Sequence, residues 1–400
     1  MIGMLLWLGA TMIGTDLDNA TDNDYLEINS TSIFEPGNFG VLGAFYTILR
    51  ITIALIYSVT CAMGILGNLL VLYLIQGFNR QSPSTINRFV FNLALTDFHF
   101  VLVLPFWAAE IVLDHIWPFG LAMCKLVLFV TVLNMYASVF FLTAMSVSRY
   151  CSMVQTLRPG RTPFRPCMVK CVILAIWLTA IAVTLPLTIY SQTVNIYGDE
   201  LCIQKFPAGQ YFLAFQHIQR ILLTFIIPLT VITVCYLLLI RFLHHHKLSG
   251  NNAKRQSKVT KSVILLIMSF LLCWLPNHVI TCWGVLVKLE LVHWSRAYYI
   301  THTYIHPFTI CLAYTNSCLN PIIYCLMRRE FREAMKNVFQ RISSVSSLWT
   351  CQGTTLYPSQ HEANQVGIPL NQMNSQLESN APGQRCNTLP STTSSLVQQN

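Results

Sequence analysis

Seven long apolar segments alternate with shorter polar stretches along this chain. They cover roughly residues 46–77, 86–113, 121–153, 167–190, 211–243, 259–287 and 297–327. Each segment is longer than the ~20 residues that an α-helix needs to cross the hydrocarbon core of a bilayer. The pattern therefore predicts an all-α membrane protein, a bundle of seven transmembrane helices.

Composition and charge support this prediction and orient the chain. Hydrophobic residues make up 54% of the chain and charged residues only 10%, which is unusual for a soluble chain of this length. With the amino terminus placed outside, the outer segments carry 11 Asp/Glu and 6 Lys/Arg, whereas the inner ones carry 4 Asp/Glu and 19 Lys/Arg. Because Lys and Arg mark the cytoplasmic side, we expect a multi-pass protein of the plasma membrane with its amino terminus outside the cell. The net charge of +9 does not indicate nucleic-acid binding, since the basic residues are scattered over inner loops.

The two ends of the chain differ from its apolar body. Residues 1–45 form an acidic arm without Lys or Arg, in which Asn19 and Asn29 begin glycosylation acceptor patterns. Residues 46–341 hold the seven segments and, after the last of them, an amphipathic eighth helix predicted to lie on the inner membrane surface. Residues 342–400 are polar and rich in Ser and Thr, which predicts a disordered cytoplasmic tail.

Two of the 14 cysteines fall at the predicted outer surface. Cys124 opens the third apolar segment, and Cys202 lies in the loop between the fourth and the fifth. An oxidising exterior would join them in a disulfide. This bond would hold the loop across the mouth of the bundle.

Polar residues inside the apolar segments are candidate functional groups, because they are costly at bilayer depth. Asp97 is the only acidic side chain deep in any segment. Asn134, Ser138, Asn316 and Asn320 could complete an oxygen-rich site around it. Two interpretations stay open, a sodium ion bound by an ionised Asp97 or a neutral aspartic acid held by hydrogen bonds.

Prolines are expected to kink five of the segments, because proline removes a backbone hydrogen bond from a helix. They are Pro105, Pro186, Pro228, Pro276 and Pro321. Kinks provide hinges, although many membrane bundles tolerate them without any switching role. Phe270 and Trp274 place large aromatic rings close to Pro276.

A set of short motifs, about one in each segment, resembles the rhodopsin-like G-protein-coupled receptors in order and spacing. The motifs are Gly67-Asn68, Asn92 to Asp97, Ser148-Arg149-Tyr150, Trp177, Pro228 with Tyr236, Cys273-Trp274-Leu275-Pro276 and Asn320-Pro321-Ile322-Ile323-Tyr324. The resemblance implies a receptor that meets a heterotrimeric G protein, with inhibitory coupling expected, and then receptor kinases and arrestin at its tail. Basic residues beside the third inner loop would contact the G protein or anionic membrane lipids. The implied activation switch consists of Asp97, Arg149, Tyr150, Tyr236, Phe270, Trp274, Pro276, Asn316, Asn320, Pro321 and Tyr324.

The chain departs from this family pattern at its inner face. Ser148 replaces the acidic neighbour that normally holds Arg149 at rest, and Gln256 stands where many relatives offer a second carboxylate. An ionic lock is therefore not expected. We predict that hydrogen bonds and packing hold the resting state instead.

Two missing residues and several longer sequence runs indicate which class of ligand to expect. The seventh segment contains no lysine, which excludes a retinal Schiff base, and Thr131 stands where amine receptors carry an aspartate. The runs at 104–110, 117–120, 134–147 and 269–277 resemble the subfamily of the relaxin-3 receptor and the insulin-like peptide 5 receptor. This resemblance implies a two-chain, disulfide-linked peptide hormone as ligand, without deciding between the two hormones. A receptor for another peptide, angiotensin-like or a chemokine, is the alternative.

The same resemblance implies that basic residues of the peptide meet acidic residues of the receptor. Trp107, Glu110 and Asp114 are spaced three and four apart, so we expect them on one face of the second helix as it leaves the membrane. Two carboxylates one turn apart repel each other, and a guanidinium of the ligand would relieve this repulsion. A solvated helix end and an ordinary polar loop are the simpler interpretations without the resemblance. Further candidate contacts are Asp199 and Glu200 in the outer loop and Arg220 in the fifth segment, which could meet a ligand carboxylate or carbonyl.

Other classes of protein fit the sequence less well. An enzyme is not predicted, because we find no metal-ligand spacing, nucleophile elbow or phosphate loop, and no cofactor is expected besides the sodium ion considered above. A transporter would show inverted repeats or several charges at the midplane, whereas we find no repeat and one midplane carboxylate. A membrane receptor is therefore the favoured function class.

Overall fold

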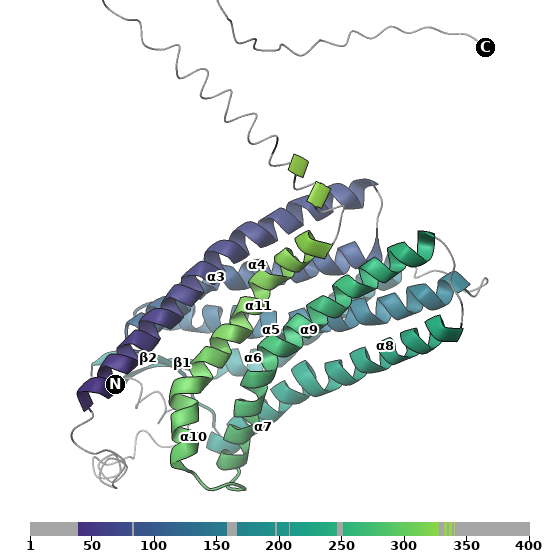
Figure 1. The fold of residues 1–400 in the computed structure, drawn as a ribbon. Helices are drawn as coiled ribbons and strands as arrows, with labels where there is room; N and C mark the ends of the chain where they lie inside the picture. The colour runs from purple at the N-terminus through teal and green to yellow at the C-terminus, as the bar shows by residue number, and fades with distance from the viewer. Residues whose placement is uncertain are drawn as a thin grey trace, which may run out of the picture. The chain divides into compact units, whose positions relative to one another are not determined.

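Seven helical segments pack along one another in the computed structural model (Figure 1). This structure describes residues 39–81, 84–157, 166–196, 198–207, 209–245, 251–327, 332–333, 336–337 and 340. Each predicted apolar segment coincides with one helical segment, so the predicted all-α, seven-helix fold is confirmed. The segments are α3 (Phe39–Gln81), α4 (Thr85–Val112), α5 (Gly120–Leu157), α6 (Pro166–Ile189), α7 (Gly209–Ile221) with η2 (Leu222–Ile226) and α8 (Ile227–His245), α9 (Asn251–Lys288), and α10 (Arg296–Ile300) with η3 (Thr301–Ile305) and α11 (His306–Met327).

The predicted terminal regions are described only at their edges. Because α3 begins at Phe39, the last residues of the predicted arm 1–45 belong to a helix. The glycosylation acceptors Asn19 and Asn29 and the tail 342–400 lie outside the described residues, and so does most of the predicted eighth helix. These features stay predictions.

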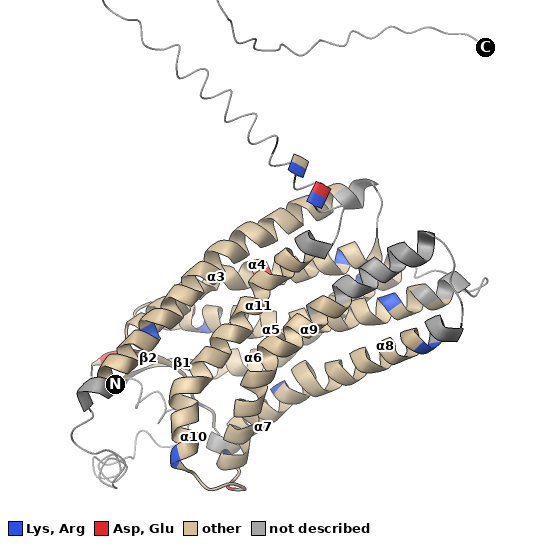
Figure 2. Cartoon of the chain, in the orientation of Figure 1, with Lys and Arg blue, Asp and Glu red and all other residues tan. Residues whose placement is uncertain are grey.

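The surface of the bundle is suited to lipid rather than to water. Six helices in the described part of the chain are long and apolar enough to cross a membrane. Large apolar side chains point outward on them, as at Leu66 (72% exposed) and Leu272 (64% exposed). Figure 2 shows that most of the helical surface is free of charge between its ends. The seventh segment is not among the six, and its α11 carries Asn316, Ser317 and Asn320, all of which are buried.

Proline explains where the helices lose their regular hydrogen bonding. The π-helical turns η2 and η3 each end two residues before a proline, Pro228 and Pro307 respectively. Because proline offers no N–H, a wider turn before it accommodates the carbonyl that lacks its donor. Pro307 was not among the predicted kink sites. The helices continue through the remaining predicted prolines, which are Pro105, Pro186, Pro276 and Pro321.

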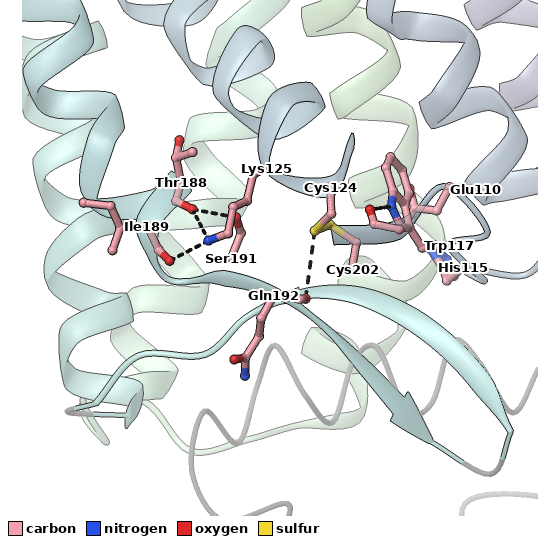
Figure 3. The surroundings of a disulfide bond; sticks show 11 residues. Glu110, His115, Trp117, Cys124, Lys125, Thr188, Ile189, Ser191, Gln192 and Cys202 are labelled. Carbon is pink, nitrogen blue, oxygen red and sulfur yellow. Dashed lines mark hydrogen bonds and ion pairs between the residues drawn. A yellow bond between two sulfur atoms is a disulfide. The ribbon is translucent and has the colours of Figure 1, made fainter. Parts of the chain in front are cut away.

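A β-hairpin covers part of the end of the bundle that is predicted to face outward, and it is the only β-sheet in the described residues. Its strands β1 (Ser191–Ile196) and β2 (Asp199–Gln204) are antiparallel. The predicted disulfide between Cys124 and Cys202 is present and ties β2 to the start of α5 (Figure 3). The backbone N–H of Trp117 donates to the carbonyl of Glu200 at 2.7 Å, which attaches β2 also to the loop before α5.

Lys125 attaches the other strand of the hairpin. Its Nζ donates to the carbonyl oxygens of Thr188 at 3.1 Å and Ile189 at 2.8 Å, the last residues of α6 (Figure 3). A cation at a helix carboxyl terminus satisfies carbonyls that have no partner within the helix and interacts favourably with the helix dipole. β1 starts two residues after Ile189, so Lys125 fixes the point at which the chain leaves the membrane.

We predict that replacing Lys125 by Met lowers the stability of the protein by about 1–2 kcal/mol, because two charge-assisted hydrogen bonds at the end of α6 are lost. The midpoint of thermal unfolding of the purified protein in detergent would measure this change. Lys170→Met is the matched control, since Lys170 is an exposed lysine near the start of the same helix. Equal midpoints for the two variants would contradict the role given to Lys125.

Candidate ligand-binding site and activation switch

A cavity of about 340 Å³ opens between the outer ends of the helices. Residues of α3, α4, α5, β2, α7, α9, η3 and α11 line it. Of the predicted ligand contacts, Trp107, Glu110 and Arg220 lie in its wall. Asp199 and Glu200 are exposed at the start of β2 and are not part of the wall. The hairpin therefore brings its acidic residues to the rim of the site at most.

Trp107 and Glu110 form the acidic side of the cavity. The Nε1 of Trp107 donates to the Thr131 hydroxyl on α5 at 2.9 Å, which directs the indole into the bundle. Glu110 is only 4% exposed, and its Oε1 lies 3.3 Å from the Nδ1 of His115. A buried carboxylate is costly unless it is paired. Glu110 therefore needs a cationic or hydrogen-bonding partner, which His115 provides here.

Asp114 differs from the prediction. α4 ends at Val112, and Asp114 has a φ of 60°, so it lies in the turn after the helix and does not share a helical face with Glu110. Its Oδ1 lies 3.0 Å from the Nη1 of Arg50 on α3 and accepts from the Tyr46 hydroxyl at 3.2 Å. Burial alone would raise the pKa of Asp114, but hydrogen bonding and attraction from cations, Arg50 among them, hold that pKa below its ordinary value. The expected repulsion between two bare carboxylates is thus relieved by partners within the protein, Arg50 at Asp114 and His115 at Glu110.

Arg220 lies on the cationic side of the cavity. Its Nη2 donates to the Nδ1 of His217 at 3.0 Å and to the hydroxyl of Thr281 at 3.2 Å, while its Nε has no partner. Among the described residues, no carboxylate forms an ion pair with it. A guanidinium held in this way is ready to receive an anionic or carbonyl group of a ligand.

Sequence reasoning missed several charged or titratable residues in the same wall. They are Arg50, His115, His217, Lys288, His302 and His306. Most of them lie inside apolar helical segments, where a polar side chain marks a functional position. The cost of polar groups at bilayer depth, which singled out Asp97, also marks these positions. His217, Lys288, His302 and His306 lie with Arg220 on the side of the cavity that α7, α9, η3 and α11 form, and Arg220 and Lys288 are the cations there.

Trp274 connects this cavity to the core below it. It lines the cavity, and its ring stacks on Phe270 with ring centroids 5.9 Å apart and on His278 with centroids 6.0 Å apart. Its Nε1 has no hydrogen-bond partner. Phe270 and Trp274 belong to the same hydrophobic cluster as Tyr324, and Tyr236 packs against that cluster. A displacement of the indole would therefore disturb packing that reaches toward the inner end.

Asp97 is the centre of a buried polar cluster that joins three helices. Its Oδ1 accepts from Asn134 Nδ2 at 2.9 Å and from the Ser138 hydroxyl at 3.3 Å, both on α5. Its Oδ2 accepts from Asn320 Nδ2 on α11 at 2.7 Å. The structure thus brings four of the five predicted residues together. Ser317, which was not predicted, donates to Asn134 Oδ1 at 3.4 Å.

Asn316 is buried close in sequence to this cluster but makes no hydrogen bond to Asp97, and its Oδ1 has no partner. The Oδ1 of Asn320 also has no partner. These oxygens, together with the carboxylate and the Ser138 hydroxyl, are the donor type that a hard cation takes. The residues therefore fit a small cation such as sodium. The described residues contain no group of three or more His, Cys, Asp or Glu side chains that could hold a metal.

Close packing brings α3 against the predicted hinge in α11. A Cβ atom added to Gly67 would lie 2.9 Å from the Cβ of Pro321. The neighbouring Asn68 donates from Nδ2 to the Ser317 carbonyl at 3.0 Å. The Gly67-Asn68 motif thus has two physical roles, since the glycine permits the approach and the amide satisfies a carbonyl near the hinge.

The inner end of the bundle holds the remaining predicted switch residues. Arg149 and Tyr150 are partly buried on α5, and Tyr324 is 2% exposed. Ser148 is buried, and its hydroxyl has no hydrogen-bond partner. The side chain of Gln256 lies outside the described residues, so the predicted absence of an ionic lock stays a prediction.

Comparisons with known proteins agree with this architecture. Residues 67–324 match the 7 transmembrane receptor (rhodopsin family) profile. Relaxin-3 receptor 1 of Mus musculus is 45% identical over 81% of this chain and 77% of its own length. Relaxin-3 receptor 2 of Homo sapiens is 46% identical over 73% of this chain and 77% of its own length. Somatostatin receptor type 2 of Mus musculus is 33% identical over 71% of this chain and 75% of its own length. This chain therefore belongs to the rhodopsin family of seven-transmembrane receptors, in the group that contains the relaxin-3 receptors.

Proposed function

We propose that this chain is a plasma-membrane receptor for a relaxin-family two-chain peptide hormone, relaxin-3 or insulin-like peptide 5, and that it activates an inhibitory G protein and lowers cyclic AMP. The observation that carries the proposal is the identity of about 45% to proteins named relaxin-3 receptors, together with a cavity that has one acidic and one basic side. Receptors for other peptides, such as the type-1 angiotensin II receptor B of Xenopus laevis, are only 33% identical. An angiotensin-like or chemokine ligand is therefore the weaker alternative.

Each side of the cavity would bind a different group of the peptide. A basic side chain of the peptide binds at Glu110 and packs on Trp107, while Asp114 attracts it at the entrance. A carboxylate or carbonyl of the peptide binds Arg220. Asp199 and Glu200 are exposed beside the entrance and steer a basic peptide inward, which accelerates association more than it strengthens the complex.

Activation is a population shift between a closed and an open inner end. The peptide binds the open form more tightly, and the G protein does the same from the other side, so that each favours the binding of the other. Trp274 transmits occupancy of the cavity to Phe270 and to the core. α11 then bends at Pro321, which brings Tyr324 toward Tyr236 and leaves Arg149 and Tyr150 to meet the G protein. Receptor kinases and arrestin would act afterwards at the cytoplasmic tail, and anionic lipids would contact the basic inner loops.

The Asp97 cluster acts as a sodium site in the resting form of this receptor. The two unpartnered amide oxygens of Asn316 and Asn320 and the hydroxyl of Ser138 support this proposal. A sodium ion there would screen the buried carboxylate. The hydrogen bonds of Asp97 hold α4, α5 and α11 together around that ion.

Cells that carry the receptor should lower forskolin-stimulated cyclic AMP when relaxin-3 or insulin-like peptide 5 is added. Glu110→Gln should weaken the potency of the active peptide by roughly 10–100-fold, because a buried charge-assisted pair contributes about 1.5–3 kcal/mol. Glu290→Gln is the matched control, since Glu290 is an exposed carboxylate after α9. Silence with both peptides, alongside a response to an angiotensin-like peptide or a chemokine, would favour the alternative.

We expect Arg50→Gln to raise the affinity for the basic peptide about fivefold, because Arg50 no longer competes for Asp114 and a partly exposed ion pair is worth about 1 kcal/mol. Saturation binding with labelled peptide on cell membranes measures this change. In the Asp114→Asn background the same Arg50 substitution should have no effect, which is the double-mutant criterion for a shared interaction. A loss of affinity in Arg50→Gln alone would mean that the ion pair builds the site rather than competing with the ligand.

Replacing sodium by N-methylglucamine at constant ionic strength should raise the affinity of the receptor for the peptide, because sodium favours the resting form. Asp97→Asn should remove this dependence, since the neutral amide does not attract the cation. Competition binding with labelled peptide over a range of sodium concentrations measures it. Equal sodium dependence in the wild type and the variant would exclude the site.

A further inference from the structure

The basic side of the ligand cavity holds two cations without an acidic partner. Arg220 lines the cavity from α7, and Lys288, the last residue of α9, lines it as well. A guanidinium stays charged in proteins, and the helix dipole favours a charged lysine at the end of a helix. Among the described residues, neither cation forms an ion pair with a carboxylate. The acidic residue of the cavity wall, Glu110, is paired with His115 on the other side.

The two cations share one environment. His217 and His306 each lie within electrostatic range of both Arg220 and Lys288, and the two cations also lie within range of each other. Like charges in a partly buried wall repel each other, and burying them is costly unless an opposite charge compensates. Water would satisfy their hydrogen bonds but would not offset their charge. An anion does both, so this side of the cavity favours an anion.

The neighbouring side chains offer hydrogen-bond donors, which is what an anion accepts. The Nε of Arg220 and the hydroxyl of Thr303 have no partner, and Thr303 lines the cavity with only 3% of its surface exposed. Because the Nη2 of Arg220 can only donate to the Nδ1 of His217, the proton of the neutral ring lies on Nε2. Likewise the Nδ2 of Asn277 donates to the Nε2 of His306, which places the proton of that ring on Nδ1. Both rings therefore have an N–H group to offer to a ligand.

A small monovalent anion suits this side better than sulfate or phosphate. An anion held by partly buried groups has to lose part of its hydration shell, and the cost of this loss rises steeply with charge. A halide accepts hydrogen bonds from any direction, so it does not need donors in a fixed array. The predicted topology opens the cavity to the outside of the cell, where chloride is the abundant halide.

We propose that the basic side of the cavity binds a chloride ion in the peptide-free receptor, with Arg220 and Lys288 as its cationic partners. The ion offsets part of their charge and accepts hydrogen bonds from the donors beside them. A carboxylate of the peptide then displaces the ion from Arg220, and this last step alone rests on the proposed function. Chloride thus competes with the peptide at the outer end of the bundle, whereas the proposed sodium ion acts from the Asp97 cluster.

Thermal unfolding of the purified receptor without peptide tests the ion site independently of the proposed function. Sodium chloride is replaced stepwise by sodium lactobionate, so that sodium and ionic strength stay constant while a bulky anion takes the place of chloride. We expect the unfolding midpoint of the wild type to be about 2–4 °C higher in physiological chloride than in lactobionate, because an ion that binds only the folded form stabilises it. Lys288→Met and Arg220→Gln should each lose most of this difference.

Arg296→Gln is the matched control, because Arg296 is an exposed cation at the start of α10 that does not line the cavity. This variant should keep the full chloride effect. Sodium bromide should act like sodium chloride, and an effect of sodium sulfate without one of chloride would overturn the choice of ion. A wild type without chloride dependence, or equal dependence in the wild type and the two cavity variants, would overturn the site. If one cavity variant does not fold, the other decides.

Displacement by the peptide is measured separately, by competition binding with labelled peptide at constant sodium. Chloride in place of lactobionate should weaken peptide binding about fivefold in the wild type, and Lys288→Met should lose this dependence. Chloride-dependent stability with chloride-independent peptide binding would overturn the displacement step and leave the proposed function intact. Absence of peptide binding in both buffers would refute the proposed function, while the thermal measurements would still decide the ion site.

Discussion

The structure depends on one constraint, that polar groups inside a membrane must find their partners within the protein. Where the partners are present, they join helices that are distant in sequence. Asp97 links α4 to α5 and α11, Asn68 links α3 to α11, and Trp177 links α6 to Asn92 on α4. Apolar packing alone would leave these helices free to slide, since lipid tails are as apolar as leucine. The polar contacts therefore fix which helices are neighbours and at which depth.

The same constraint identifies the functional sites where partners are missing. The Nε of Arg220 and the Nε1 of Trp274 have no hydrogen-bond partner, whereas both carboxylate oxygens of Asp97 accept hydrogen bonds. Both atoms belong to residues that line the outer cavity. On the opposite side, Glu110 in the wall and Asp114 beside it are paired with His115 and Arg50. The proposed peptide would therefore replace an existing partner on the acidic side, whereas on the other side it would supply the partner that Arg220 Nε lacks within the protein.

Sequence reasoning was sufficient for features that depend on hydrophobicity or on depth in the membrane. The seven segments, the Cys124–Cys202 bond and the grouping of Asp97 with Asn134 and Asn320 follow from segment length, compartment and the cost of burying polar groups. It failed where local backbone geometry decided the outcome. Spacing placed Asp114 on the helix, but α4 ends two residues earlier and the chain turns with positive φ. The hairpin likewise depends on how the chain leaves α6, and the π turns depend on the local backbone geometry before Pro228 and Pro307.

The sequence also did not indicate which side chains pair with one another, because the pairing depends on which helices lie side by side in the bundle. Arg50 lies 64 residues before Asp114, and nothing in the pattern of either segment indicates that α3 brings the guanidinium to that turn. The basic wall shows the same limit. His217, Lys288, His302 and His306 come from three helical segments, the fifth, sixth and seventh, and form a common surface only after the bundle has assembled.

Close packing at Gly67 gives a physical basis to the bend that we propose for α11 at Pro321. Because Gly67 has no side chain, the ring of Pro321 packs directly against the α3 backbone, at the depth of the Asp97 cluster. In the proposed activation, the inner half of α11 would rotate about this contact, while the outer half and its wall of the cavity stayed in place. The first helix of the bundle would then act as the pivot that lets one end of the receptor reorganise while the other end keeps its ligand.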